Sequence, residues 1–378
     1  MYTPEDVNVR FNNNPQNTSL ASRANKKRLV IYGNGDTFKF FHEIVLSPLC
    51  LDVSVIIDQR HQFSYRKDGI IYTYLEDRML EAYKDDALVI VCIGQPEQSY
   101  QVEQTLKNIG FADVARFDQF YDYQKVYGYD LSAQDISLQV QTDWQDVLDA
   151  YTNLSDEDSK DIYWSVIATH LNSTVQQIKN LPQHSQYFEF DLFACSDYQH
   201  ALQLGGFDGD TFRNAQAHSD IFDTIMVLEP SGVNFKKLYD FLHHSYADRK
   251  LQIINAAAGA AQGKLSFAAG GGPTARARDG QNVTSVPIWP VDQLELITDP
   301  TFIFIDIEGA ESQALDGMTS TLFRAKPNLA ISAYHHPYDI YRITNRMAET
   351  GLFSAFYLRN YSGSVVDTVL YCKSKQSG

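Results

Sequence analysis

The chain has 378 residues, 44% of them hydrophobic and 21% charged, which predicts a globular protein of two domains. Its formal net charge of −16 argues against nucleic acid and anionic membrane surfaces as partners, because clustered Lys and Arg bind both. No stretch approaches the roughly 18 apolar residues of a membrane span, and no apolar signal segment opens the chain. The four cysteines are scattered and form no C-x-x-C motif. We therefore predict a cytoplasmic protein without a disulfide framework.

The first part of the chain predicts a small domain. Residues 1–26 are polar and rich in Asn, and we expect a flexible arm. Over residues 27–128, apolar strands alternate with helical stretches, which predicts a parallel sheet in a Rossmann-like α/β domain. The predicted strands lie within residues 28–36, 52–58, 87–94 and 113–120.

A glycine turn follows the first of these strands. Gly33 and Gly35 match part of a dinucleotide fingerprint, but Phe38 occupies the third glycine position. Asp58 ends the second strand, where a ribose ligand would lie. The turn is compatible with a second nucleotide site, and equally with a degenerate nucleotide fold used for substrate presentation or assembly.

The middle of the chain loses the strand pattern. We expect a helical linker over residues 129–185, with a helix at 155–171 that begins in a capping box of Ser155 and Asp158. The α/β alternation returns over residues 186–378 and ends in a hairpin around Gly363. A parallel sheet closed by a hairpin predicts a methyltransferase-type sheet, whose other strands lie within residues 201–205, 224–230, 251–259, 301–309 and 328–335.

The stretch ALQLGGFDGDTF, residues 201–212, places glycines between a strand and a helix, as in nucleotide-binding turns. Asp208 and Asp210 would repel a phosphate, whereas S-adenosylmethionine has no phosphate and carries an ammonium and a sulfonium. We therefore predict that this loop binds S-adenosylmethionine. The alternative is that both aspartates only begin the next helix, where its dipole favours acids.

Two further strand ends carry candidate adenosine ligands. Glu229 ends the strand IMVLEP, and an acid there can accept both ribose hydroxyls, in S-adenosylmethionine or in NAD. Asn255 follows the next strand and could hold either the adenine edge or neighbouring backbone. Ala256 and Ala257 would leave room for the ring.

The stretch FIFIDIEGAE, residues 302–311, is the second strong signal. Asp306 and Glu308 stand two apart and should share one face at the strand end, lining the ligand crevice. His335 ends the fifth strand and is a candidate base, with Asp306 and Glu308 as alternatives, because the usual histidine pKa is about 6.5. These three residues could also hold a divalent cation, but they lack a diagnostic ligand spacing, so we predict no metal site.

In order, the motifs LQLGGFDGDTF, VLEPSGVNFKKL, INAAAG, VDQL, FIFIDIEGAESQAL and LAISAYHHPYDIYRI resemble the FkbM family of S-adenosylmethionine-dependent methyltransferases over residues 186–345. The resemblance implies a class I methyltransferase fold and O-methylation of a sugar, glycan or natural product. It also implies that Glu229 is the ribose ligand, Asn255 an adenine-side residue and Asp306 an acid at the methionine end or in the active site. The cofactor loop would comprise Gly205, Gly206, Gly209 and Thr211.

This chain departs from the family pattern at two positions. Gln203 stands where the family usually has an acid, and Phe304 stands where it often has a lysine. Gln203 offers no formal charge to the cofactor ammonium, so cofactor affinity should be weaker unless Asp208 compensates.

We therefore expect an α/β methyltransferase whose substrate is a small-molecule or glycan hydroxyl, with a homo-oligomer left open. One alternative is an NAD-dependent sugar-nucleotide enzyme that works through Gly33 and Asp58. The other is a non-catalytic assembly module that binds neither cofactor. The sequence does not identify the acceptor, the oligomeric state or the general base.

Overall fold

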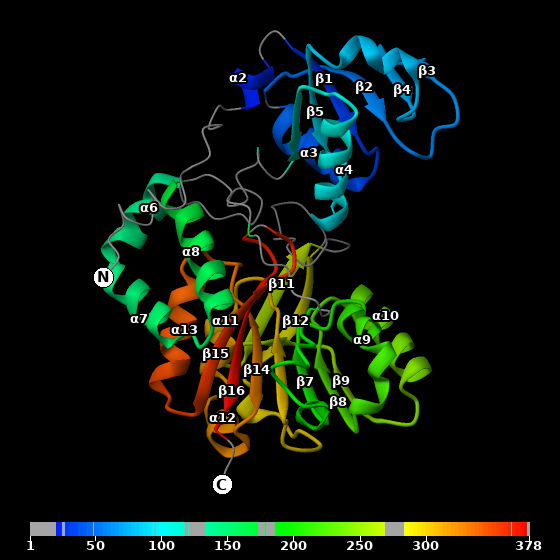
Figure 1. Ribbon diagram of the computed structural model, residues 1–378. Helices are drawn as coiled ribbons and strands as arrows, with labels where there is room; N and C mark the ends of the chain where they lie inside the picture. The colour runs from blue at the N-terminus through cyan, green and yellow to red at the C-terminus, as the bar shows by residue number, and fades with distance from the viewer. Residues whose placement is uncertain are drawn as a thin grey trace. The chain divides into compact units, whose positions relative to one another are not determined.

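The computed structural model describes residues 20–24, 27–47, 49–94, 96–117, 120, 133–172, 178, 186–268, 283–363 and 365–375. Residues 1–19 of the predicted arm, and 129–132, 173–177 and 179–185 of the predicted linker, lie outside this set. The chain divides into two compact units (Figure 1). The first contains the described residues up to Gln141 with Ser165–Ile178 and Ser362–Val365, and the second contains Thr142–Trp164, the described residues of 179–361 and those from Val366 onward. The boundaries of the four predicted segments stay predictions.

The first unit contains a sheet with the strand order β3-β4-β2-β1-β5-β6. The four predicted strands are confirmed as β1, β2, β5 and β6, and their pairings are parallel. Buried aliphatic side chains cover both faces of this sheet. The strands are β1 (Arg28–Tyr32), β2 (Val53–Ile57), β3 (Tyr65–Lys67), β4 (Ile70–Thr73), β5 (Ala87–Val91) and β6 (Asp113–Arg116). The helices are α2 (Leu20–Ala24), α3 (Asp36–Phe41), η1 (His42–Leu46), η2 (Arg78–Tyr83) and α4 (Pro96–Asn108).

Three helices occupy the described part of the predicted linker. They are α6 (Ala133–Thr142), α7 (Trp144–Asn153) and α8 (Glu157–Asn172). The predicted helix is confirmed, but its predicted cap is wrong by one residue. The side chain of Asp156 accepts the Ser159 N–H at 2.8 Å, while the Ser155 hydroxyl accepts the Phe356 N–H at 3.0 Å.

The second unit contains a seven-stranded sheet with the order β15-β16-β14-β13-β7-β8-β9. Its first five strands along the chain pair in parallel, and the C-terminal hairpin pairs antiparallel, with β16 beside β14. This is the expected sheet closed by a hairpin. The strands are β7 (His200–Leu204), β8 (Thr224–Leu228), β9 (Lys250–Ile254), β13 (Phe302–Ile305), β14 (Asn328–Ser332), β15 (Phe353–Asn360) and β16 (Thr368–Ser374).

The remaining elements of this unit are helices and a small second sheet. The helices are η4 (Cys195–Tyr198), α9 (Asp210–Asn214), η5 (Gln216–Ile221), α10 (Gly232–Ser245), η6 (Val291–Gln293), α11 (Glu311–Asp316), α12 (Thr319–Ala325) and α13 (Asp339–Glu349). The small sheet contains β10 (Ala257–Ala258), β11 (Gly263–Ala268) and β12 (Val283–Trp289). None of the helices in the described part of the chain is long and apolar enough to cross a membrane.

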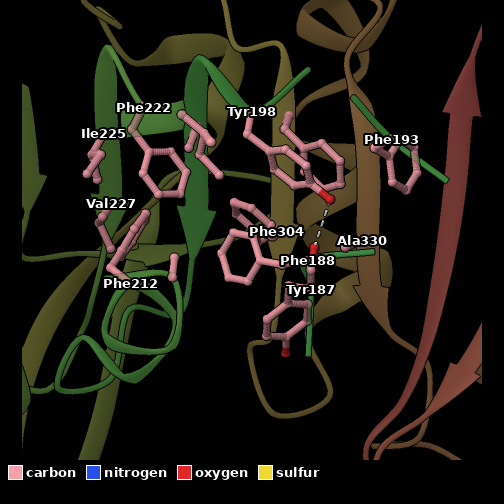
Figure 2. Close-up of a cluster of buried hydrophobic side chains, with 14 of the residues drawn as sticks. Tyr187, Phe188, Phe193, Tyr198, Phe212, Phe222, Ile225, Val227, Phe304 and Ala330 are labelled. Carbon is pink, nitrogen blue, oxygen red and sulfur yellow. Dashed lines mark hydrogen bonds between the residues drawn. The ribbon is translucent and has the colours of Figure 1, made fainter. Parts of the chain in front are cut away.

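One face of the large sheet carries an aromatic core (Figure 2). Tyr198 stacks on Phe302 with ring centroids 4.5 Å apart, and Phe302 stacks on Phe304 at 4.8 Å. Burying one such ring contributes about 1.5–3 kcal/mol relative to leaving it exposed. Core packing therefore accounts for many of the aromatic residues, and it fixes the strands whose carboxyl ends carry the site.

Candidate active site

A cavity of about 710 Å³ lies in the second unit, at the carboxyl ends of the parallel strands. The chain leaves β7 toward β8 and β9 on one side and returns to β13 on the other, so this is the point where ligands bind in open α/β sheets. Of the residues predicted from the sequence, the cavity wall includes Gly205, Asp210, Thr211, Glu229, Ala256, Asp306 and Glu308. It does not include Gly206, Asp208, Gly209, Asn255 or His335.

The glycine loop lies directly against the end of β13. Gly205 has a φ of +86°, and a Cβ there would be 1.8 Å from the Asp306 carbonyl oxygen. No other residue fits at this position without moving one of the two strands. Gly209 has a φ of +91° and precedes α9, while Gly206 packs on Val227. At Gly205 the loop therefore lines the cavity with backbone atoms and no side chain.

The two loop aspartates have different environments. The Asp208 carboxylate accepts a hydrogen bond from Arg213 at 3.0 Å, and Asp208 is not among the residues that line the cavity. Asp210 lines the cavity, and within the described part of the chain its carboxylate accepts one hydrogen bond, from the Thr211 N–H at 2.8 Å. Burial and the nearby carboxylates of Asp306 and Asp208 raise the pKa of Asp210. A cationic ligand in the cavity would therefore contact Asp210. Asp208 is poorly placed to supply the negative charge that Gln203 lacks.

Gln203 is the penultimate residue of β7 and is almost fully buried, with 1% of its surface exposed. Its amide nitrogen donates to the Gly205 carbonyl and to the Thr211 hydroxyl, both at 2.9 Å. Its amide oxygen has no hydrogen-bond partner among the described residues, although Gln203 lines the cavity. A buried acceptor without a donor is costly, so this oxygen is suited to a ligand N–H or O–H.

Glu229 follows β8 and is 5% exposed. One carboxylate oxygen accepts the Ser231 N–H at 2.7 Å, and the other accepts the Phe207 N–H at 2.8 Å. Since a carboxylate offers about four acceptor positions, each oxygen can still accept a hydroxyl from the cavity. Burial raises the pKa of Glu229 to about 7, despite these backbone hydrogen bonds.

Asn255 stabilises this corner of the site. Its amide nitrogen donates to the carbonyl oxygens of Glu229, at 2.8 Å, and Pro230, at 3.2 Å. Of the two roles considered for Asn255, the structure shows the backbone contact. Ala256 and Ala257 also line the cavity, and their side chains are only methyl groups.

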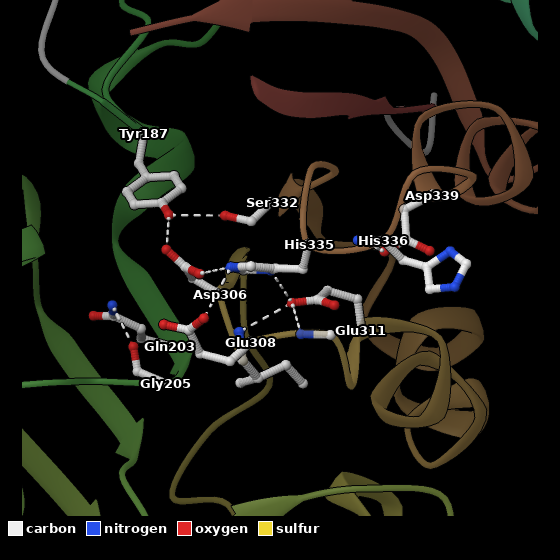
Figure 3. Close-up of polar contacts among 12 residues, drawn as sticks. Tyr187, Gln203, Gly205, Asp306, Glu308, Glu311, Ser332, His335, His336 and Asp339 are labelled. Carbon is white, nitrogen blue, oxygen red and sulfur yellow. Dashed lines mark hydrogen bonds and ion pairs between the residues drawn. The ribbon is translucent and has the colours of Figure 1, made fainter. Parts of the chain in front are cut away.

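A network of acids surrounds His335 (Figure 3). Its Nδ1 lies 2.8 Å from Glu311, and its Nε2 lies 3.4 Å from Asp306 and 3.5 Å from Glu308. The fully buried Glu311 also accepts the Ile307 and Gly309 N–H groups, which holds the turn after β13. His335 itself is 1% exposed.

The charge state of His335 follows from these neighbours. Burial alone would lower its pKa, but Glu311, Asp306 and Glu308 outweigh burial and raise the pKa to about 9. Burial and the neighbouring carboxylates also raise the pKa of Glu308, which the His335 charge opposes. At neutral pH, His335 is therefore a cation whose ring N–H groups can donate hydrogen bonds. Glu308 is more basic than an ordinary glutamate, because its pKa is raised.

The same network contains a group that could hold a metal ion. Ligand atoms of Asp306, Glu311 and His335 lie within 4.8 Å of one another. However, Glu311 and the Nδ1 of His335 already bind each other, and a metal at Nε2 would have to displace the proton that the carboxylates retain there.

Sequence reasoning missed three residues of the site. The Tyr187 hydroxyl donates to Asp306 at 2.6 Å and also contacts the Ser332 hydroxyl at 3.1 Å. Tyr334 and Asp367 line the cavity from the loops after β14 and before β16. Tyr334 was visible beside His335 in the motif, but nothing local to Tyr187 or Asp367 in the sequence indicates a site.

The glycine turn of the first unit is organised differently. All four acceptor positions of Asp58 are used, by the backbone N–H groups of Asn34 and Arg60 and by two guanidinium contacts of Arg60 at 2.6 and 2.8 Å. The Arg60 hydrogen bonds keep the pKa of Asp58 well below its usual range. A ribose would have to displace Arg60, so the geometry disfavours a dinucleotide site at Gly33.

Most of the residues that line the cavity belong to a part of the chain that is similar to a known protein family. Residues 203–357 match the methyltransferase FkbM domain. The crystal structure of methyltransferase FkbM from Methylobacillus flagellatus KT is similar over 92% of this chain and 90% of that chain, with 21% identity and a TM-score of 0.64, which shows a shared fold. The O-methyltransferase from Bacillus cereus in complex with SAH matches over 65% of this chain and 100% of that chain, with 13% identity and a TM-score of 0.32. No curated protein matches the chain.

Proposed function

We propose that the protein uses S-adenosylmethionine to methylate a hydroxyl of a sugar, a glycan or a natural product, a proposal supported by the match of residues 203–357 to the methyltransferase FkbM domain. The observation that carries the proposal is the cavity at the β7–β13 switch point. It combines a close-fitting glycine loop with a buried carboxylate, Glu229, that still has acceptor positions open.

The residues present fit an adenosine ligand without phosphates. Glu229 would accept the two ribose hydroxyls, and Ala256 and Ala257 leave space for the base. The unpartnered oxygen of Gln203 and the carboxylate of Asp210 would accept hydrogen bonds from the methionine ammonium. None of the described residues that line the cavity is a Lys or Arg that would bind a pyrophosphate.

We assign the proton transfer to Glu308. It lines the cavity, its pKa is raised, and its φ of +58° is unusual for a residue with a side chain. S-adenosylmethionine, when bound, would supply its sulfonium methyl group to the hydroxyl oxygen and leave as S-adenosylhomocysteine. Glu308 accepts the hydroxyl proton as the oxygen attacks, while positively charged His335 holds Glu308 and Asp306 in place.

Isothermal titration with S-adenosylmethionine and with NAD tests the proposal. We expect saturable binding of S-adenosylmethionine alone, lost or strongly weakened in Glu229→Ala. Asp208→Asn is the matched control, because Asp208 lies in the same loop but faces Arg213. Binding of NAD alone would favour the sugar-nucleotide alternative, and binding of neither would favour the assembly module.

A further inference from the structure

The cavity wall is strongly acidic. Five carboxylates line it, and among the described lining residues there is no Lys, Arg or His. The five are Asp210, Glu229, Asp306, Glu308 and Asp367. A cleft whose low-dielectric walls carry charges of one sign concentrates ligands of the opposite sign and repels ligands of the same sign.

The cofactor accounts for only part of this charge. In the proposed function, Glu229 binds neutral ribose hydroxyls, and Asp210 with Gln203 binds the ammonium. Asp306, Glu308 and Asp367 remain together at the other end. His335 is the cation beside them, and Glu311 already binds it behind the wall.

Asp367 is the acid of this group that the proposed reaction does not use. It lies just before β16 in the C-terminal hairpin, with a φ of +57°. It receives a hydrogen bond from Tyr334, but no described Lys or Arg forms an ion pair with it. Burial and the charge of Asp306 raise the pKa of Asp367 to about 6, an effect that the charge of His335 opposes, so Asp367 is mostly ionised at neutral pH.

The surroundings of Asp367 suit an organic cation. Tyr334 and Tyr187 both line the cavity, and aromatic faces attract ammonium groups. The Tyr334 ring packs against the His335 ring with centroids 4.2 Å apart, which fixes its position.

We propose that the acceptor carries a protonated amine near the hydroxyl that is methylated, as an amino sugar does, and that Asp367 binds this amine. The proposal rests on the proposed function and narrows its substrate class. Acceptors that carry phosphate or carboxylate groups, including sugar nucleotides, are excluded by the same charge. The amine is bound and not consumed, since the methyl group goes to the hydroxyl oxygen and the hydroxyl proton to Glu308.

The test uses the full chain saturated with S-adenosylhomocysteine and three matched probes at pH 7: glucosamine, glucose and glucose 6-phosphate. Dissociation constants come from ligand-observed NMR. We expect glucosamine to bind about 5- to 10-fold more tightly than glucose, and glucose 6-phosphate to bind most weakly. Asp367→Asn should reduce glucosamine affinity to that of glucose, and Asp367→Glu should retain the preference.

Asp316→Asn is the control, because Asp316 pairs with Arg346 away from the cavity. The affinity of each variant for S-adenosylhomocysteine shows whether it is folded. Equal affinities for glucosamine and glucose, tightest binding of the phosphate, or no binding of any probe to the cofactor-loaded protein would each overturn the proposal. If S-adenosylhomocysteine itself fails to bind, the proposed function fails instead.

Discussion

The pKa of Glu229 makes cofactor binding depend on pH. Burial raises this pKa to about 7, and the ribose hydroxyls would bind the ionised carboxylate. Affinity should therefore rise with pH, because protonation removes acceptor positions. With a pKa near 7, about 9% of the Glu229 carboxyl groups are ionised at pH 6 and about 91% at pH 8, which corresponds to an affinity change of about tenfold, or ~1.4 kcal/mol.

Isothermal titration of S-adenosylhomocysteine between pH 6 and pH 8 measures this change. Glu229→Gln keeps the shape of the side chain and removes the titration, so its affinity should be weaker at pH 8 and vary little over the range. Asp208→Asn should retain the wild-type slope, since Asp208 faces Arg213. A flat wild-type profile, or an unchanged slope in Glu229→Gln, would refute the assignment of Glu229 as the ribose ligand.

Three further predictions concern the acid network and the loop. Glu308→Gln should lower turnover by about 10²–10⁴-fold while S-adenosylhomocysteine affinity stays near wild type, and a turnover close to wild type would remove Glu308 as the base. Glu311→Gln should lower the pKa of His335, so the alkaline limb of the kcat/KM–pH profile should move below about 9, and an unmoved limb would contradict a role for the His335 charge. Gly205→Ala should lower both the melting temperature and cofactor affinity, because its methyl group would lie 1.8 Å from the Asp306 carbonyl oxygen. Normal melting and binding in that variant would show that the loop is not held as described.

The sequence predicted the strands that both sheets bury most deeply. Strands such as β5 and β13 are short apolar runs, and their burial on both faces explains why the apolar pattern is continuous. The missed strands have little such pattern. Strand β3 is exposed at all three residues, and Lys264 and Ser266 interrupt β11 with polar side chains. Backbone pairing with a neighbouring strand, which depends on tertiary structure, forms these elements.

The site, too, combines residues that the local sequence predicts with residues that only the tertiary structure brings together. Residues at the ends of parallel strands, such as Glu229 and Asp306, are predictable, because these ends meet at one edge of the sheet. Tyr187 and Asp367 reach the cavity from segments outside the motifs. Which loop aspartate faces the cavity was also beyond the sequence, because the Arg213 contact decides it.

His335 shows most clearly how surroundings alter a role suggested by residue type. A histidine at a strand end suggests a base, because its usual pKa lies close to neutral pH. In the structure, Glu311 binds one ring nitrogen, and Asp306 and Glu308 lie near the other, so the ring retains its proton up to a pH of about 9. A group that is already protonated cannot take up the proton of the substrate hydroxyl at neutral pH. Its positive charge instead opposes the rise in the pKa of Glu308 and keeps that carboxylate available as the base.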